Sequence, residues 1–108
     1  MFLWIDDLRE PPKTGNNWLW ARSVNEAKTA IMFYERQYQA DFILIDLDHD
    51  AGDYGWDGGD YIEVLKWLEH QQLPDTGYTF HIHTMNPVGR DNMRAIINSN
   101  GWKEIKRK

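Results

Sequence analysis

The sequence contains no cysteine, which excludes disulfides, thiolate metal sites and thiol catalysis. It also lacks any apolar run of membrane length, and it begins directly with a short strand-like stretch, so we expect neither a membrane span nor a signal peptide. The formal net charge of -5 argues against a general surface for duplex nucleic acid. Together these absences favour a cytoplasmic protein.

Aromatic side chains supply much of the apolar material that is present. Hydrophobic residues make up 42% of the 108 residues and aromatic residues 14%, including six tryptophans. These rings offset a mean hydropathy of -0.69, which by itself is low for a folded domain. The length and the apolar content suffice for one core, so we predict a single domain over residues 1–108.

Charge is unevenly distributed along the chain. Residues 41–60 hold seven acidic side chains and neither lysine nor arginine, whereas from Arg90 onward six basic residues stand against two acidic ones. The acidic block indicates a cation site. The basic end is typical of a solvated terminus, with contact to a phosphate as the alternative.

Apolar residues recur at spacings that alternate between strand and helix. We expect strands at residues 2–7, 18–22, 42–46, 79–84 and 102–105. We expect helices from residue 24 to 38, from residue 61 to a stop near Pro74, and from residue 87 to 98. Ser23 and Glu26 form a capping box before the first helix, and Gly101 follows the last one. The Gly- and Asp-rich residues 50–60 should form a loop.

This alternation predicts an α/β fold with a mostly parallel sheet and helices on both of its faces. In such sheets ligands bind beyond the carboxyl ends of the strands, where the strand order switches. Polar clusters follow three of the expected strands, at Asp6–Asp7, Asp46–Asp50 and His81–Thr84. If these strands are neighbours, one edge of the sheet gathers five aspartates and three histidines.

The motifs in these clusters resemble those of a known family. DDLREPP at residues 6–12, LDHD at 47–50 and HIHTMNPVGRDNM at 81–93 are similar to the cyclic-phosphate processing receiver-like domains. That family is a divergent branch of the response-regulator receiver fold. The resemblance spans nearly the whole chain and implies a flavodoxin-like sheet in the order 2-1-3-4-5 with an acidic pocket. It also implies a task in handling cyclic phosphates on nucleotides or RNA ends.

Two features depart from an ordinary receiver. Only ten residues, Asp7 to Asn16, separate the first acidic pair from the next strand region, so the first helix should be shortened or missing. Receivers also keep a lysine at the end of the fifth strand, and both Lys103 and Lys106 are candidates for that position. Ordinary phosphotransfer is therefore the less favoured chemistry.

The acidic residues are candidate metal ligands. Consecutive aspartates such as Asp6 and Asp7 can end a strand in a turn, but they can also hold Mg²⁺ together with waters. The resemblance places Asp48 at the phosphoacceptor position of receivers, and Asp46 should lie lower on the strand, half-buried and hydrogen-bonded. We predict a divalent metal, Mg²⁺ or alternatively Mn²⁺. Its predicted ligands are Asp6, Asp7, Asp48 and Asp50.

Two histidines should share one face of a strand, because side chains alternate along it. His81 and His83 can be satisfied core residues, or they can bind a metal or move a proton near neutral pH. We predict the second role. The predicted catalytic set is His83, His81, His49 and Asp48.

The turn at residues 86–90 is a candidate phosphate site. Asn86 can cap a helix with Pro87 in its first turn, and the same geometry offers backbone N–H groups to an anion. Gly89 would permit close approach, and Arg90 suits a bidentate phosphate contact. The predicted phosphate ligands are Arg9, Thr84, Asn86, Gly89 and Arg90. Trp56, in the expected loop, can stack on a base or lie against the surface.

The sequence thus predicts a domain that binds a small ligand carrying a cyclic phosphate, on a nucleotide or an RNA end. Metal-assisted hydrolysis is the leading reaction, because a bound cation neutralises phosphate charge and activates water. One alternative is a sensor that binds a cyclic nucleotide without catalysis. Another is a phospho-receiver that uses Asp48 as the acceptor and Thr84 as the switch residue.

Overall fold

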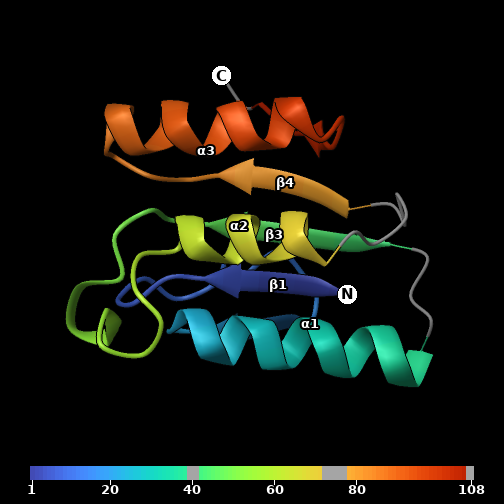
Figure 1. The fold of residues 1–108 in the computed structure, drawn as a ribbon. Coiled ribbons are helices and arrows are strands. Elements are labelled where there is room, and N and C mark those ends of the chain that lie inside the picture. Colours follow the sequence, from blue (N-terminus) through green and yellow to red (C-terminus); the bar gives the residue numbers. More distant parts are fainter. Residues whose placement is uncertain (39–41, 72–77, 107–108) are drawn as a thin grey trace.

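Five parallel strands of the described residues form one sheet in the order β2-β1-β3-β4-β5 in this computed structural model (Figure 1). The structure describes residues 1–38, 42–71 and 78–106. The strands are β1 (Phe2–Ile5), β2 (Trp18–Ala21), β3 (Ile43–Leu47), β4 (Tyr78–Ile82) and β5 (Lys103–Glu104). The expected receiver-like order is confirmed, and β5 is shorter than expected.

Three α-helices connect the strands in the part of the chain that the structure describes. They are α1 (Val24–Tyr38), α2 (Ile62–His70) and α3 (Pro87–Ser99), and a single 3₁₀ turn, η1 (Gly52–Tyr54), lies in the loop after β3. No helix separates β1 from β2, so the expected loss of the first receiver helix is confirmed. None of the described helices is both long and apolar enough to cross a membrane.

The predicted starts of α1 and α3 are confirmed, and one hydrogen bond of the capping box at α1 has a different partner than expected. Ser23 Oγ accepts the Glu26 N–H at 3.1 Å, as a capping box requires, but the Glu26 carboxylate accepts the N–H of Arg22 at 2.9 Å. Asn86 caps α3. The expected end of the second helix near Pro74 lies outside the described residues.

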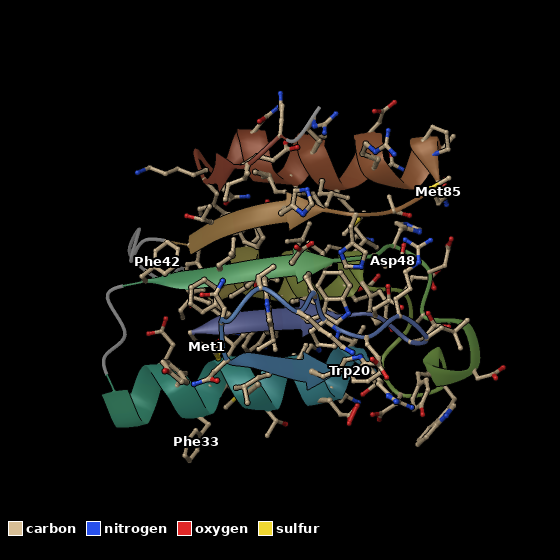
Figure 2. All side chains as sticks on the ribbon, turned by 180° about the vertical axis from the view of Figure 1, so that it is seen from behind. Met1, Trp20, Phe33, Phe42, Asp48 and Met85 are labelled. Atoms are coloured by element: carbon tan, nitrogen blue, oxygen red, sulfur yellow. The ribbon has the colours of Figure 1, made fainter. Side chains whose placement is uncertain are left out.

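The expectation of helices on both faces of the sheet is wrong for the described residues. The core joins alternate strand residues such as Leu3, Ile45 and Phe80 to apolar residues from all three helices. Figure 2 shows the strands in front of the helices when the molecule is seen from behind. Strand order explains this, because the three connections that contain the helices all run in the same direction across the sheet. These connections join β2 to β3, β3 to β4 and β4 to β5. Right-handed crossovers therefore put all three helices on one face.

The face without helices carries aromatic side chains and is partly covered by the segment between β1 and β2. Trp4 Nε1 donates to the Arg9 carbonyl at 2.7 Å, and Trp20 Nε1 donates to the Asp6 carbonyl at 2.8 Å. Trp18 packs edge-on against both Phe2 and Trp4, with ring centroids 5.5 and 5.9 Å apart. The two indole hydrogen bonds hold the segment after β1 against this face.

Candidate functional site

The polar clusters converge because β1, β3 and β4 are adjacent in the sheet. Trp4 of β1 pairs with Asp46 of β3, which in turn pairs with His81 of β4, so these three side chains form a row on the helix-free face. Asp48 lies toward the carboxyl ends of the strands (Figure 2). The strand order alone therefore brings the acids and histidines to one edge.

Four side chains form a continuous hydrogen-bonded chain across this edge. Asp6 Oδ2 lies 2.9 Å from His83 Nε2, and His83 Nδ1 lies 2.6 Å from Asp46 Oδ1. The same Asp46 oxygen lies 2.8 Å from His81 Nδ1. Both carboxylates are buried, with 1% and 2% of the residue exposed. We refer to Asp6, His83, Asp46 and His81 as the Asp–His chain.

The two histidines of the Asp–His chain have different partners. An ionised carboxylate only accepts a hydrogen bond, so a ring nitrogen that carries a proton can donate to it. His83 faces a carboxylate with each of its two nitrogens. His81 donates from Nδ1 alone, and its Nε2 has no partner in the part of the chain that the structure describes. The two histidines are thus not equivalent.

His83 is held by packing as well as by hydrogen bonds. Its ring stacks on Trp4, with centroids 4.0 Å apart and planes within 1° of parallel. Aromatic rings stacked in this way make a favourable contact beyond the area that they bury. Trp4 is fixed in turn by its hydrogen bond to the Arg9 carbonyl. Sequence reasoning missed this role of Trp4, although its position two residues before Asp6 puts both side chains on one face.

Asp6 is a well-satisfied carboxylate. Its Oδ1 accepts the backbone N–H groups of Leu8 and Arg9, both at 2.8 Å. Burial alone would raise the pKa of Asp6, but the N–H groups of Arg9 and Leu8 together with His83 outweigh it and lower the pKa. Most of the acceptor capacity of Asp6 is therefore used within the protein.

The pKa of Asp7 is shifted in the opposite direction to that of Asp6. Burial raises its pKa, and the negative charges of Asp6 and Asp48 raise it further. The loop after β3 closes on Asp7, because a Cβ at Gly52 would run into the Asp7 carboxylate, and Gly52 has a φ of +54°. Asp7 thus lies near the carboxylates of Asp6 and Asp48, and Asp6 has His83 as a further partner.

The distances allow a small cation at this point. Asp6, Asp48 and His83 each offer one ligand atom, and the three atoms lie within 4.8 Å of one another. Asp50 belongs to a second, more exposed group with His49 and Asp60. His49 Nδ1 lies 2.9 Å from Asp50 Oδ1. Of the four predicted metal ligands, Asp6 and Asp48 thus fall in one group, Asp50 falls in the other, and Asp7 lies beside the first group without belonging to it.

The predicted phosphate turn is largely satisfied by its own side chains. Asn86 Oδ1 accepts the Gly89 N–H at 3.0 Å, and Thr84 Oγ1 accepts the Asn86 N–H at 3.1 Å. Arg90 Nη2 donates to the Thr84 carbonyl at 2.7 Å. Gly89 packs against His49, since a Cβ there would lie 2.5 Å from His49 Cγ. These contacts leave the other guanidinium N–H groups of Arg90 available.

Four other candidates are exposed. Arg9 is exposed next to the acids, and its guanidinium has no hydrogen bond or ion pair within the described ranges. Trp56 is 82% exposed in the loop after β3. Lys103 and Lys106 are both exposed, and Lys106 lines a polar cavity together with His81 and Arg90.

A parallel sheet in this order, with aspartates and histidines gathered at its carboxyl edge, defines a receiver-like α/β domain. A family model described as the cyclic-phosphate processing receiver domain matches residues 1–99, and the chain belongs to that family. The comparisons with curated proteins and with solved structures gave no match.

Proposed function

We propose that this domain binds a cyclic phosphate on a nucleotide or RNA end and hydrolyses it at the carboxyl edge of the sheet. The observation that carries the proposal is the Asp–His chain beside Asp7 and Asp48. It places proton-carrying rings next to carboxylates that favour a cation. Membership in a family named for cyclic-phosphate processing supports the choice of ligand.

The carboxylates fit a hard divalent cation, with Mg²⁺ as the first choice and Mn²⁺ as the second. Asp7 and Asp48 would supply most of the oxygen ligands, because the oxygens of Asp6 are mainly engaged by Leu8, Arg9 and His83. Burial raises the pKa of Asp7, the charges of Asp6 and Asp48 raise it further, and a cation would relieve that repulsion. When bound, the cation neutralises phosphate charge and lowers the pKa of a coordinated water.

His81 is the proton carrier in this proposal, and His83 shares its Asp46 partner. Both nitrogens of His83 are engaged by carboxylates, so that ring can release a proton only by breaking a contact with Asp6 or Asp46. His81 keeps Nε2 available while Asp46 fixes its tautomer through Nδ1. His81 Nε2 can therefore accept a proton or return it to the leaving hydroxyl.

Two arginines can contact the phosphate oxygens. Arg9 is exposed directly after the acids, and Arg90 retains guanidinium N–H groups beyond the one given to the Thr84 carbonyl. An anionic ligand must overcome the negative charge of the three aspartates. A guanidinium on each side of the site would therefore add its positive charge to that of the cation. In this arrangement Asn86, Gly89 and Thr84 position Arg90 at the start of α3.

Turnover of cyclic nucleotides tests the proposal. The protein is incubated with 2′,3′- and 3′,5′-cyclic nucleotides and Mg²⁺ or Mn²⁺, and products are followed by phosphorus NMR. We expect metal-dependent hydrolysis, which His81→Gln lowers by about 10²- to 10⁴-fold. His70→Gln, at the exposed end of α2, is the matched control and should keep full activity. Binding without product in any combination would instead support a sensor, and no binding would contradict the proposal.

A further inference from the structure

A polar cavity lies next to His81 on the side away from Asp6. Its volume is about 240 Å³, and it is lined by His81, Ile82, Arg90, Arg94, Glu104, Ile105 and Lys106. The cavity exists because β5 is only two residues long and ends opposite Phe80, whereas β4 continues to Ile82. Side chains of α3 and the residues after β5 therefore border the end of β4.

The cavity has an excess of positive charge in a chain whose net charge is -5. Glu104 forms a bidentate ion pair with Arg94, with Nε–Oε1 and Nη2–Oε2 distances of 2.9 and 2.7 Å. That pair consumes the carboxylate that lines the cavity. Arg90 and Lys106 remain as cations without a carboxylate partner in the described ranges. Two unpaired cations beside a histidine make a site for an anion.

His81 borders both this cavity and the Asp–His chain. Its Nδ1 shares Asp46 Oδ1 with His83, at 2.8 and 2.6 Å, so the cavity and the acidic site are neighbours along the carboxyl edge of the sheet. A ligand whose cyclic phosphate lies at the acids can therefore place a second anionic group in the cavity. Consecutive phosphates of a nucleic-acid strand provide such a pair of groups, and basic grooves commonly follow them.

Resting on the function proposed above, we propose that this cavity binds the second phosphate of a strand that ends in a cyclic phosphate. The preferred ligand is then the end of an RNA strand and not a cyclic mononucleotide. A mononucleotide carries one phosphate, which Arg90 can contact from the acidic site, and it leaves Lys106 without a partner. The net charge of -5 agrees with recognition of a strand end and not of a long stretch of nucleic acid.

Titration with inorganic phosphate tests the cavity independently of any nucleotide. Chemical shifts of the Arg94 Nε–Hε group and of the Ile105 and Lys106 amides are followed by ¹H–¹⁵N NMR, with chloride as the ionic-strength control. We expect saturable shifts at these groups. Lys106→Ala should weaken phosphate binding about twofold to fivefold, as for one exposed charge contact, and Glu104→Gln should strengthen it by removing the competing carboxylate. Lys103→Ala is the matched control, because Lys103 is an exposed lysine of β5 that does not line the cavity.

Absence of shifts at the cavity, or equal shifts in all variants, would overturn the assignment of an anion site. A second measurement compares a dinucleotide and a mononucleotide, both ending in a 2′,3′-cyclic phosphate, by calorimetry with Mg²⁺. We expect tighter binding of the dinucleotide, with the affinity ratio reduced in Lys106→Ala and kept in Lys103→Ala. Equal affinities in the wild type would overturn the inference while leaving the proposed function intact. Failure of both nucleotides to bind would contradict the proposed function itself.

Discussion

At the scale of single residues, Asp46 connects the two histidines that the function needs. One oxygen of this buried carboxylate receives a hydrogen bond from His81 and another from His83. The sequence predicted a hydrogen-bonded Asp46, and the structure confirms this while burying it more deeply than expected. Its two partners could not be predicted from spacing alone, because they depend on which strand lies beside β3.

Replacing Asp46 should destabilise the fold. In Asp46→Asn both histidines lose an ionised acceptor. A hydrogen bond to a charged group contributes about 1.5–3 kcal/mol to the free energy of unfolding. We expect a loss of about 2 kcal/mol in the free energy of unfolding, measured by urea denaturation. Asp53→Asn, on an exposed residue of η1, should change it by less than about 0.5 kcal/mol. Equal stability of Asp46→Asn and wild type would contradict the Asp–His chain.

Asp7 should make the metal-free protein less stable as the pH rises. Its pKa in the folded protein is raised above the ordinary value of 3.8 by burial and by Asp6 and Asp48. Between those two pKa values the native state binds more protons than the unfolded chain, so the free energy of unfolding contributed by Asp7 falls with increasing pH. Asp7→Asn should therefore be more stable than wild type at neutral pH, with the advantage shrinking in acid.

The measurement is urea denaturation in EDTA at about pH 5 and about pH 7. The difference between Asp7→Asn and wild type gives the contribution of the Asp7 charge together with its interactions with Asp6 and Asp48. A variant that is less stable than wild type at the higher pH would show that the Asp7 carboxylate is not repelled by its neighbours.

At the scale of elements, the start of α3 is placed by a close approach to the loop after β3. Sequence reasoning assigned Gly89 to ligand approach, whereas the structure puts the His49 ring where a Cβ would lie. The capping role of Asn86 could be read from the sequence, because it depends on residues within one turn. The contact with His49 could not, since it joins residues 40 positions apart in the chain.

Gly89→Ala should reverse the usual effect of this substitution. Alanine in place of glycine normally stabilises a helix by about 1 kcal/mol. Here the added methyl group meets His49 Cγ and Cδ2 at 2.5 and 2.6 Å, so overpacking should cost about 1–3 kcal/mol. Chemical denaturation measures the change. Adding His49→Ala should recover most of the loss, and a simple gain in stability from Gly89→Ala would contradict the observed packing.

At the scale of the whole molecule, strand order decides both the site and the position of the helices. The strand order implied by the resemblance is confirmed, whereas the expectation of helices on both faces of the sheet was wrong. Three crossovers in one direction place α1, α2 and α3 on one face, and the segment of residues 6–17 is too short to supply a helix for the other. Handedness could have given this result from the sequence, once the order was accepted.

The aromatic content also makes sense only for the whole molecule. Four aromatic rings contact one another on the helix-free face, namely Phe2, Trp4, Trp18 and Phe42. Composition predicted that aromatic rings would carry much of the packing, but it could not say on which face. Trp4 belongs to this group and to the site, because it supports His83.

The central claim is that Asp7 and Asp48, with Asp6 beside them, bind one divalent cation, and thermal unfolding with and without Mg²⁺ or Mn²⁺ tests it most directly. A cation that binds only the native state adds about 2.7 kcal/mol at a hundredfold excess over its Kd. At about 4–8 °C per kcal/mol, the Tm should rise by about 10 °C or more.

Asp48→Asn should lose most of this rise while making the metal-free protein more stable, since one of three neighbouring charges is gone. Asp50→Asn, in the separate group with His49 and Asp60, should keep the rise. A small shift that Asp48→Asn leaves intact would mean that the metal acts only as a salt, and it would contradict the metal site and the mechanism built on it.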